Sequence, residues 1–260
     1  MAYSTLILQI SGDIATITLS RPEKRNAIST EMMNDLMGAF GEIETCSARV
    51  AILTGQGKAF SSGMDLAALK TLATQSPAEN LDDARRFARL LRRIWSFPKP
   101  TIAAVNGAAI AGACGMATLC DFTLAAPEAT FGYPEVGIGF LPATVAIFLM
   151  RQIGEKHARD LLLTGRIIDA AEAHRRGLIT QIVPATELMA AARTLAATLL
   201  ASSPTSLLKT KELICDIAAP EIDRQLDLAI AESAQIRTTP DFREGLASFL
   251  EKRPPKWSGR

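Results

Sequence analysis

Residues 101–116 read TIAAVNGAAIAGACGM and place a strand, a turn and a candidate helix start within one short stretch. Thr101–Val105 is an apolar run typical of a buried strand, and Asn106-Gly107 ends it. Small residues around Gly112 allow the backbone to approach a ligand closely. If a helix begins there, its free N–H groups favour negative charge on a bound group. A tight, closely packed turn without a ligand explains the same residues.

Further strands alternate with helices through the first 130 residues. Ile14–Leu19 alternates apolar and polar positions, and residues 50–53 form a short apolar run that ends at Gly55. Between them, Ser29 is a candidate cap for a helix that begins at Thr30. An apolar stripe follows on that helix at Met33, Leu36, Met37 and Phe40. This alternation predicts an α/β layer architecture.

Beyond residue 150 the pattern becomes helical. We expect helices over 156–164, 170–176 and 187–200, with a last strand over 179–183. Ser203-Pro204-Thr205 marks the start of a further helical segment that reaches about Phe249 as two or three helices. The chain therefore divides into an α/β core, residues 1–200, and a C-terminal helical region, residues 201–260.

Composition excludes several classes of function. The 260 residues are 48% hydrophobic and carry 28 Lys and Arg against 27 Asp and Glu, a net charge of +1. A near-neutral chain is not expected to bind nucleic acid through charge, and no apolar run approaches the ~20 residues of a membrane span. The N-terminal residues do not resemble a signal peptide, so a cytoplasmic location is expected. The expected partner is a small molecule.

Cysteine and histidine usage argues against a metal site. The four cysteines, Cys46, Cys114, Cys120 and Cys215, show no paired spacing, which predicts free thiols. His157 and His174 are the two histidines, and both lie in the helical half beside basic residues. We therefore expect carboxylates and backbone groups to carry any chemistry.

An arginine-rich stretch over residues 85–93 allows two interpretations. Arg85, Arg89, Arg92 and Arg93 share one helical face by steps of three and four residues. A solvent-facing helix surface is one interpretation. A binding edge for a phosphate-bearing ligand is the other.

Three segments contain groups suited to catalysis. Residues 57–66 and 106–116 each place a glycine-containing turn after a strand, and two N–H groups aimed at one oxygen would form an oxyanion hole. Glu135 follows in the segment FGYPEVGIGF, residues 131–140. Its apolar neighbours predict a poorly solvated carboxyl with a raised pKa, although an exposed loop glutamate fits the same letters.

A serine or cysteine hydrolase is an alternative interpretation of the same segments. Ser61, Ser62 and Cys114 lie near the candidate turns, yet the chain lacks a G-x-S-x-G elbow. Cys114 and Cys120 are expected to be small core residues, and the two histidines to lie on the surface.

The order of these segments resembles the enoyl-CoA hydratase/isomerase (crotonase) superfamily over nearly the whole chain. The matching segments are Arg21-Pro22, Asn26-Ala27, AFSSGMDL (59–66), IAAVNG (102–107), AGA (111–113), CD (120–121), FGYPE (131–135), Gly137, Gly139, LTG (163–165), AAEA (170–173), GL (177–178), EG (244–245), Phe249 and EKR (251–253). Each alone is weakly specific, and together they are very specific.

The resemblance implies a ClpP/crotonase-type spiral of ββα units. It also implies a C-terminal helical region that mediates trimer packing, so a homotrimer or a homohexamer is expected. The residue pattern predicts the same division of the chain into a core and a C-terminal helical region.

The resemblance further implies an acyl-CoA thioester as substrate. Carried over, the backbone N–H groups of Met64 and Gly112 hold the thioester oxygen, and Glu135 moves protons. Family hydratases have a second glutamate twenty residues earlier, and that position is Gly115 here. Glycine cannot act as a base, so the two-carboxylate route to hydration is not available.

For coenzyme A, which is part of the substrate rather than a separate cofactor, the resemblance implies five contact positions. These are Lys24, Arg25, Ala27, Asp65 and Leu66. Ala67 stands where relatives often have a lysine, and Lys252 or Arg253 of a neighbouring subunit is a candidate replacement. The acyl group is expected between the helix around residues 69–91 and residues 140–142.

Three functions remain open from the sequence. The first is enoyl-CoA hydratase with Glu135 as the single acid and base, and the second is enoyl-CoA isomerase, which needs one carboxylate only. The third is an acyl-CoA-binding or RNA-associated protein with weak catalysis, against which the intact Glu135 argues.

Overall fold

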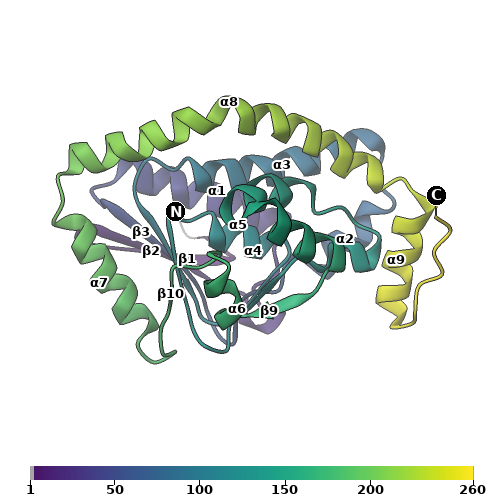
Figure 1. Ribbon diagram of the computed structural model, residues 1–260, viewed down its shortest axis with the longest axis horizontal. Coiled ribbons are helices and arrows are strands. Elements are labelled where there is room, and N and C mark those ends of the chain that lie inside the picture. The colour runs from purple at the N-terminus through teal and green to yellow at the C-terminus, as the bar shows by residue number, and fades with distance from the viewer. Residues whose placement is uncertain (1–2, 260) are drawn as a thin grey trace.

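Four successive ββ units, each followed by helix, build the computed structural model, which describes residues 3–259 (Figure 1). The first unit is β1 (Leu6–Ser11), β2 (Ile14–Leu19), the 3₁₀ turn η1 (Pro22–Lys24) and α1 (Thr30–Thr45). The second is β3 (Val50–Gly55), β4 (Ala59–Ser61), α2 (Leu66–Leu72) and α3 (Pro77–Trp95). The third is β5 (Thr101–Val105), β6 (Ala108–Ile110) and α4 (Gly112–Thr118). The fourth is β7 (Phe122–Ala125), β8 (Thr130–Gly132), the 3₁₀ turn η2 (Pro134–Ile138) and α5 (Ala143–Thr164).

The remaining elements complete both sheets and cover them. They are β9 (Ile167–Asp169), α6 (Ala170–Arg175), β10 (Gln181–Ile182), α7 (Leu188–Leu200), α8 (Pro204–Ile236) and α9 (Pro240–Glu251). The large sheet has the order β1-β2-β3-β5-β7-β10, and the small sheet has the order β4-β6-β8-β9. From the second unit to the fourth, the first strand therefore joins the large sheet and the second strand joins the small one. This is the ββα spiral that the sequence predicts.

The central strands of the large sheet are buried on both faces, and their successive side chains point to opposite sides. Ile52, Ile102 and Ala104 pack with α7 in one apolar cluster, whereas Leu53, Ala103 and Val105 belong to the main core. Successive strand residues point to opposite faces, so such double burial requires apolar residues at every position. This accounts for the apolar runs that the sequence shows over 50–53 and 101–105.

Local sequence signals account for most helix ends. The Ser29 side chain accepts a hydrogen bond from Met32 N–H at the start of α1, as its position predicts. Ser203 caps α8 in the same way, and α8 and α9 are the two helices of the C-terminal region. In Figure 1, α8 runs across the molecule over α3, and it contacts both α3 and α5.

Two predicted elements differ in extent. The strand expected over 179–183 is only Gln181–Ile182, which pairs with Leu124 and Ala125 of β7, and Pro184 has no N–H with which to extend the ladder. The helix expected over 156–164 is the second half of α5, which changes direction at Gly154, where φ is +76°. Within residues 3–259, none of the helices has the length and apolarity to cross a bilayer.

Candidate active site

Three parallel strands deliver the candidate catalytic groups to one edge of the small sheet. Strands β4, β6 and β8 are parallel neighbours, so their carboxyl ends meet at the same edge. Met64 lies three residues beyond β4, Gly112 two beyond β6, and Glu135 three beyond β8. All three line one cavity of about 910 Å³. The repeated unit thus assembles a site from segments far apart in the sequence.

The Met64 peptide is oriented by a short bridge to Ile28. Ile28 N–H donates to Gly63 O at 2.8 Å, and Asp65 N–H donates to Ile28 O at 2.9 Å. In a parallel bridge the residue between these two bonds directs its own N–H away from its partner. Gly63 makes this turn with φ at +87°, and a Cβ there would lie 3.0 Å from Ile110 O. A larger residue at position 63 would therefore push the turn away from β6.

Gly112 begins α4 directly after a strained residue. Ala111 has φ of +57° and ψ of −130°, and its N–H donates to Gly132 O at 2.8 Å. A Cβ on Gly112 would lie 2.4 Å from Cζ of Phe87, so the Phe87 ring closes against the glycine backbone. No protein group in residues 3–259 accepts a hydrogen bond from the N–H of Gly112 or of Met64. Both donors are available to a ligand oxygen.

Glu135 is buried and one of its oxygens is free. Its side chain belongs to η2, the residue is 8% exposed, and no protein group in the described chain donates to the buried Oε2. Burial raises the pKa of this carboxyl to about 7. The sequence-based prediction of a poorly solvated carboxyl is confirmed, and the group is poised to accept and release protons near neutral pH.

The turn that holds Glu135 is supported from behind by the end of α5. A Cβ on Gly165, which caps α5, would lie 3.4 Å from Cα of Pro134 and 3.1 Å from a methyl group of Val136. A Cβ on Gly132 would lie 2.8 Å from the carbonyl oxygen of Arg166. The backbone on either side of Glu135 therefore packs directly on the α5–β9 turn.

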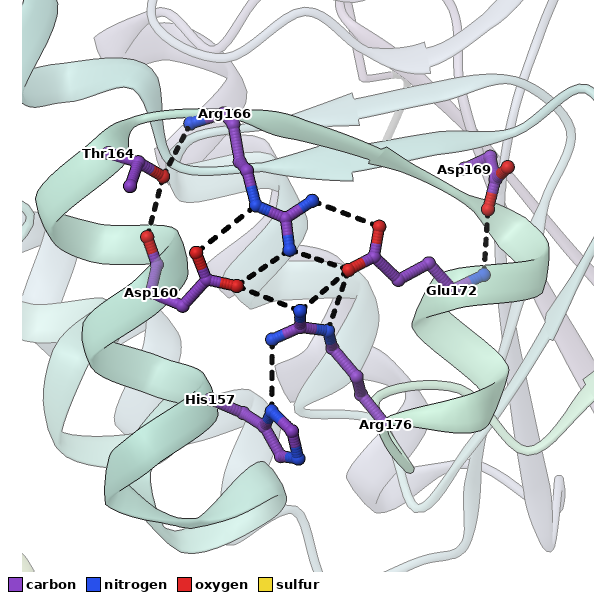
Figure 2. A network of polar contacts seen from close by, with 7 residues as sticks. All are labelled: His157, Asp160, Thr164, Arg166, Asp169, Glu172 and Arg176. Atoms are coloured by element: carbon purple, nitrogen blue, oxygen red, sulfur yellow. Dashed lines mark hydrogen bonds and ion pairs between the residues drawn. The ribbon is translucent and has the colours of Figure 1, made fainter.

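An ion-pair network fixes that turn, and Figure 2 shows it from close by. Arg166 Nη2 lies 2.6 Å from Asp160 Oδ2 and 2.6 Å from Glu172 Oε1, and Arg176 contacts the same two carboxylates. Hydrogen bonds from Arg166 hold the pKa of both carboxyls at about 2. His157 contacts Arg176 in this network and lies on the surface, as predicted.

The position of the missing glutamate is filled by apolar side chains. A Cβ on Gly115 would lie 2.8 Å from Cγ1 of Val145 and 3.6 Å from Cδ1 of Leu91. Val145 lines the cavity in the place of a second carboxylate. Two other carboxylates of the lining are already paired, since Asp65 binds Arg21 at 3.0 Å and Asp83 binds Arg237 at 2.9 Å.

The predicted coenzyme positions line the same cavity. Lys24 and Arg25 are exposed, Ala27 is buried, and Leu66 is 52% exposed for a large apolar residue. The Asp65 carboxylate caps α2 by accepting from Ala67 N–H at 2.9 Å. This hydrogen bond fixes the backbone of Asp65. Contact of the coenzyme with the five predicted positions remains a prediction.

The buried Asn26 side chain holds the loop that carries Lys24 and Arg25. Its amide nitrogen donates to Gln56 O and Ala59 O at 2.9 Å each, and its oxygen accepts from Arg21 N–H. Arg25 and Asn26 both have positive φ, near +50°. The loop beside the cavity is therefore fixed to β3 and β4.

The arginine stretch on α3 is largely engaged by neighbouring carboxylates. Arg92 binds Asp223 at 2.7 Å, Arg93 binds Glu44, and Arg85 binds Asp82. Arg86 is the member of the stretch that lines the cavity, and it lies 3.8 Å from Asp83. Arg92 and Arg93 therefore attach α3 to α8 and α1, whereas Arg85 and Arg86 contact carboxylates within α3, so the arginines do not form a continuous phosphate-binding edge.

The hydrolase alternative finds no support in the geometry. Cys114 is fully buried, and burial raises the pKa of its thiol to about 12, so the thiolate is not accessible at neutral pH. Cys120 is buried in the same way. Both are core residues, as predicted.

Several residues of the cavity were not singled out from the sequence. Leu69, Gln75 and Phe87 lie within residues 69–91, where the acyl group was predicted, although this segment forms parts of two helices, α2 and α3, and not one. Val145 and Arg237 also line the cavity and were not predicted. Phe87 and Val145 are apolar helix residues, and residue type alone does not show whether such a side chain lies in the core or lines a cavity. Arg237 joins the site across 154 residues of sequence from Asp83. A signal for this pair would require knowledge of the fold.

Comparisons with known proteins agree with this geometry. Residues 9–260 match the family described as enoyl-CoA hydratase/isomerase. A Thermus thermophilus relative is 42% identical over 95% of this chain and 98% of its own length. The short-chain-enoyl-CoA hydratase of Clostridium acetobutylicum is 33% identical over 97% of each chain. The crystal structure of an enoyl-CoA hydratase/isomerase from Xanthobacter autotrophicus Py2 has a TM-score of 0.89 with 30% identity, covering 97% of this chain and 98% of that one.

Proposed function

The chain belongs to the enoyl-CoA hydratase/isomerase family, and we propose that it adds water to 2-enoyl-CoA thioesters with Glu135 as its single acid and base. One observation carries this proposal. The desolvated carboxyl of Glu135, with its free Oε2, lines the same cavity as the two unpaired N–H groups of Met64 and Gly112. A proton-transfer group and an oxyanion hole are the two requirements of thioester enolate chemistry.

Each step can be assigned to these three residues. The Glu135 carboxylate accepts a proton from water while the water oxygen forms a bond to C3 of the enoyl group. The electrons of the double bond move toward the thioester oxygen, where the N–H groups of Met64 and Gly112 stabilise the enolate, each donor contributing about 2.7–4 kcal/mol. Protonated Glu135 then returns the same proton to C2. The product is the 3-hydroxyacyl-CoA, and the carboxylate is regenerated.

A pKa of about 7 for Glu135 suits both transfers. A carboxyl with an ordinary pKa is a weak base toward water and a strong acid toward carbon, whereas a pKa near the working pH balances the two steps. Because the same carboxylate also starts the reverse reaction, by removing the C2 proton, rates in both directions should rise with pH through 7 and then level off. These steps use protons and hydrogen bonds and require no cofactor besides the coenzyme A of the substrate.

Isomerisation of the double bond is the second candidate, and the surroundings of Gly115 favour it. Val145 occupies the place of a second carboxylate, and isomerisation needs only one base that removes a proton from one carbon and returns it to another. The named relatives, which include the crotonyl-CoA hydratase of Syntrophomonas wolfei, place hydration first.

The assembly and the location are proposals, and an exposed apolar helix face supports the assembly. We propose a homotrimer or a homohexamer that works in the cytoplasm. Leu213, Ile214 and Ile217 on α8 are 60%, 62% and 75% exposed, and steps of three and four residues place them on one helix face. Lys24 and Arg25 are proposed to meet the coenzyme phosphates at the cavity.

The direct test uses two substrates. Purified protein is incubated with crotonyl-CoA in one reaction and with a 3-enoyl-CoA in another, and products are followed by mass and absorbance. Gain of the mass of water with crotonyl-CoA supports hydration. Conversion of the 3-enoyl-CoA to its 2-enoyl isomer without hydration supports the isomerase, and inactivity toward both contradicts both assignments.

A further inference from the structure

A cluster of polar residues lies in the cavity lining between the start of α3 and the end of α8. It comprises Gln75, Asn80, Asp83, Ser233 and Arg237, here called the Arg237 cluster. All of its members except Asn80 line the cavity that contains Glu135. Neither the oxyanion hole nor the proton transfers proposed above use any of them.

Arg237 is almost completely removed from solvent, yet one of its donors has no partner. The residue is 3% exposed, and its Nη1 donates to Asp83 Oδ2 at 2.9 Å and to Asn80 O at 3.3 Å. The guanidinium carbon lies 5.3 Å from the centre of the Phe140 ring. No protein group among the described residues accepts a hydrogen bond from Nε. A buried N–H without an acceptor is unfavourable, and a ligand acceptor would remove this cost.

A second unpaired polar atom belongs to the same cluster. Oε1 of Gln75 is buried and receives no hydrogen bond from the described part of the protein. Asn80 links the two residues, since its side chain accepts from Arg237 Nη1 at 3.4 Å and donates to the carbonyl oxygen of Gln75 at 3.4 Å. The cluster therefore contains one unpaired donor and one unpaired acceptor, on two residues that line the same cavity.

The position of the cluster corresponds to the tail of the acyl group. Phe140 lies between Arg237 and the reacting centre, because its N–H donates to Glu135 O at 2.9 Å while Arg237 covers its ring. Phe140 also lines the cavity where the acyl chain is expected. An acyl group whose double bond lies at Glu135 can therefore extend past Phe140 to Arg237.

Charge balance decides what kind of group fits there. Asp83 pairs with Arg237 at 2.9 Å and lies 3.8 Å from the partly exposed Arg86, so a ligand carboxylate at the buried Arg237 would lie close to the Asp83 charge and be repelled by it. A methyl group would leave both unpaired atoms without partners. A hydroxyl group both accepts and donates, so its chemistry matches a site with one unpaired donor, Arg237 Nε–H, and one unpaired acceptor, Gln75 Oε1.

We propose that Arg237 and Gln75 form a specificity site for an acyl chain that carries a hydroxyl group near its end. This inference rests on the proposed function, because it assigns the substrate class of the same cavity. Arg237 and Gln75 bind the tail of the substrate and take no part in bond making. An alkyl 2-enoyl-CoA of equal length should react through the same steps, less efficiently.

The test compares 2-enoyl-CoA substrates that end in a hydroxyl, a methyl or a carboxylate group, each over a series of chain lengths. At the best length we expect kcat/KM for the hydroxyl compound to exceed that of its methyl analogue by at least about tenfold. The carboxylate compound should be the poorest of the three. Equal values for hydroxyl and methyl at every length, or a preference for the carboxylate, would overturn the inference.

Two variants separate the site from general stability. Arg237→Lys keeps a positive charge beside Asp83 but removes the Nε–H, and Gln75→Met removes the acceptor without touching the ion pair. Each should reduce the hydroxyl preference, which is the ratio of kcat/KM for the hydroxyl and methyl compounds on the same variant, to below about threefold. Gln235→Met, at an exposed position on α8 outside the cavity, is the matched control and should keep the full preference. An unchanged preference in both cavity variants would contradict the assignment.

A binding measurement distinguishes this inference from the proposed function. Calorimetry with saturated acyl-CoA ligands that end in hydroxyl or methyl needs no turnover. If hydration is absent, a tenfold tighter Kd for the hydroxyl ligand still supports the specificity site. If hydration is present but the two ligands bind equally, the proposed function stands and the specificity site does not.

Discussion

Glu135 illustrates how the environment of one residue sets its reactivity. Its carboxyl is held in η2, where apolar side chains and the α5–β9 turn exclude water. The charged form therefore costs free energy in the folded protein, and the pKa rises to about 7. The same burial that makes the group a useful base makes it a burden on stability at high pH.

Glu135→Gln should stabilise the protein in a pH-dependent manner. Below the ordinary pKa of 4.5 the carboxyl is neutral in the folded and the unfolded chain, so the substitution changes little. Above pH 7 the folded wild type carries a desolvated charge that the unfolded chain solvates, and the variant should gain up to about 3 kcal/mol. Urea denaturation at pH 4.5 and pH 8 measures both values. A gain that is equal at the two pH values would contradict a charge-based origin.

Gly112→Ala should damage the oxyanion hole without removing its N–H. The added Cβ would lie 2.4 Å from Cζ of Phe87, so either the ring or the start of α4 must move. We expect kcat to fall by about 10–100-fold, because small misplacements of a catalytic group are costly. A second substitution, Phe87→Leu, should restore part of the loss. No recovery in the folded double variant would show that Phe87 is not the cause.

Residues differ in how far the sequence alone reveals them. The apolar neighbours of Glu135 predict its burial, because they are adjacent in the chain. The Arg237–Asp83 pair is invisible to such reasoning, since 154 residues separate its members and either one alone resembles an ordinary surface charge. Gly115 shows in the sequence that the second glutamate of family hydratases is missing. Only the packed structure shows that the Val145 side chain fills the space beside it.

At the scale of elements, α8 is fixed to the core by a buried charge. Lys211 Nζ donates to Asp121 Oδ2 at 2.6 Å and to Lys99 O at 2.9 Å. The same carboxylate oxygen accepts from the Thr101 backbone at 2.7 Å and from its hydroxyl at 2.9 Å. One aspartate therefore links β5 to the first half of α8.

Lys211→Met should destabilise the protein by about 2 kcal/mol, because it leaves the Asp121 charge with neutral partners only. The measurement is the urea midpoint near neutral pH. Lys209→Met is the matched control on the same helix, since Lys209 is solvent-exposed and pairs with Glu212 at the surface. Equal midpoints for the two variants would show that the pair of Lys211 with the partly exposed Asp121 contributes nothing.

Element boundaries follow the sequence where a local chemical signal exists. Ser29 and Ser203 predict the starts of α1 and α8, and the apolar run Thr101–Val105 coincides with β5. The end strand β10 is shorter than its sequence suggests, because the length of a strand depends on its partner. The direction change at Gly154 depends on a positive φ that the letter permits without requiring it.

For the whole molecule, repetition of one unit creates the site. The second strands of three consecutive units become parallel neighbours, and each contributes one functional group just beyond its end. The spiral and the C-terminal helices were predictable from the sequence, by alternation of elements and by family resemblance. The path of α8 back over α3 was not, because it depends on contacts between distant residues such as Arg92 and Asp223 (Figure 1).

The proposed assembly predicts a mass in solution of three or six times 27.8 kDa by light scattering. Ile217→Lys should lower this mass, because it places a charge on the exposed apolar face of α8, where the residue is 75% exposed. Circular dichroism should show an unchanged helix content in the variant. A wild-type mass of one chain would contradict the assembly.

The most direct test of the central claim is crotonyl-CoA turnover by Glu135→Gln, with the Kd for an unreactive acyl-CoA measured on the same preparation. Loss of one acid–base group should reduce kcat by about 10²–10⁴-fold, while Kd stays within about tenfold because Met64, Gly112 and the coenzyme positions are intact. That result would establish Glu135 as the proton carrier of the site. Wild-type turnover in the folded variant would remove Glu135 from the mechanism.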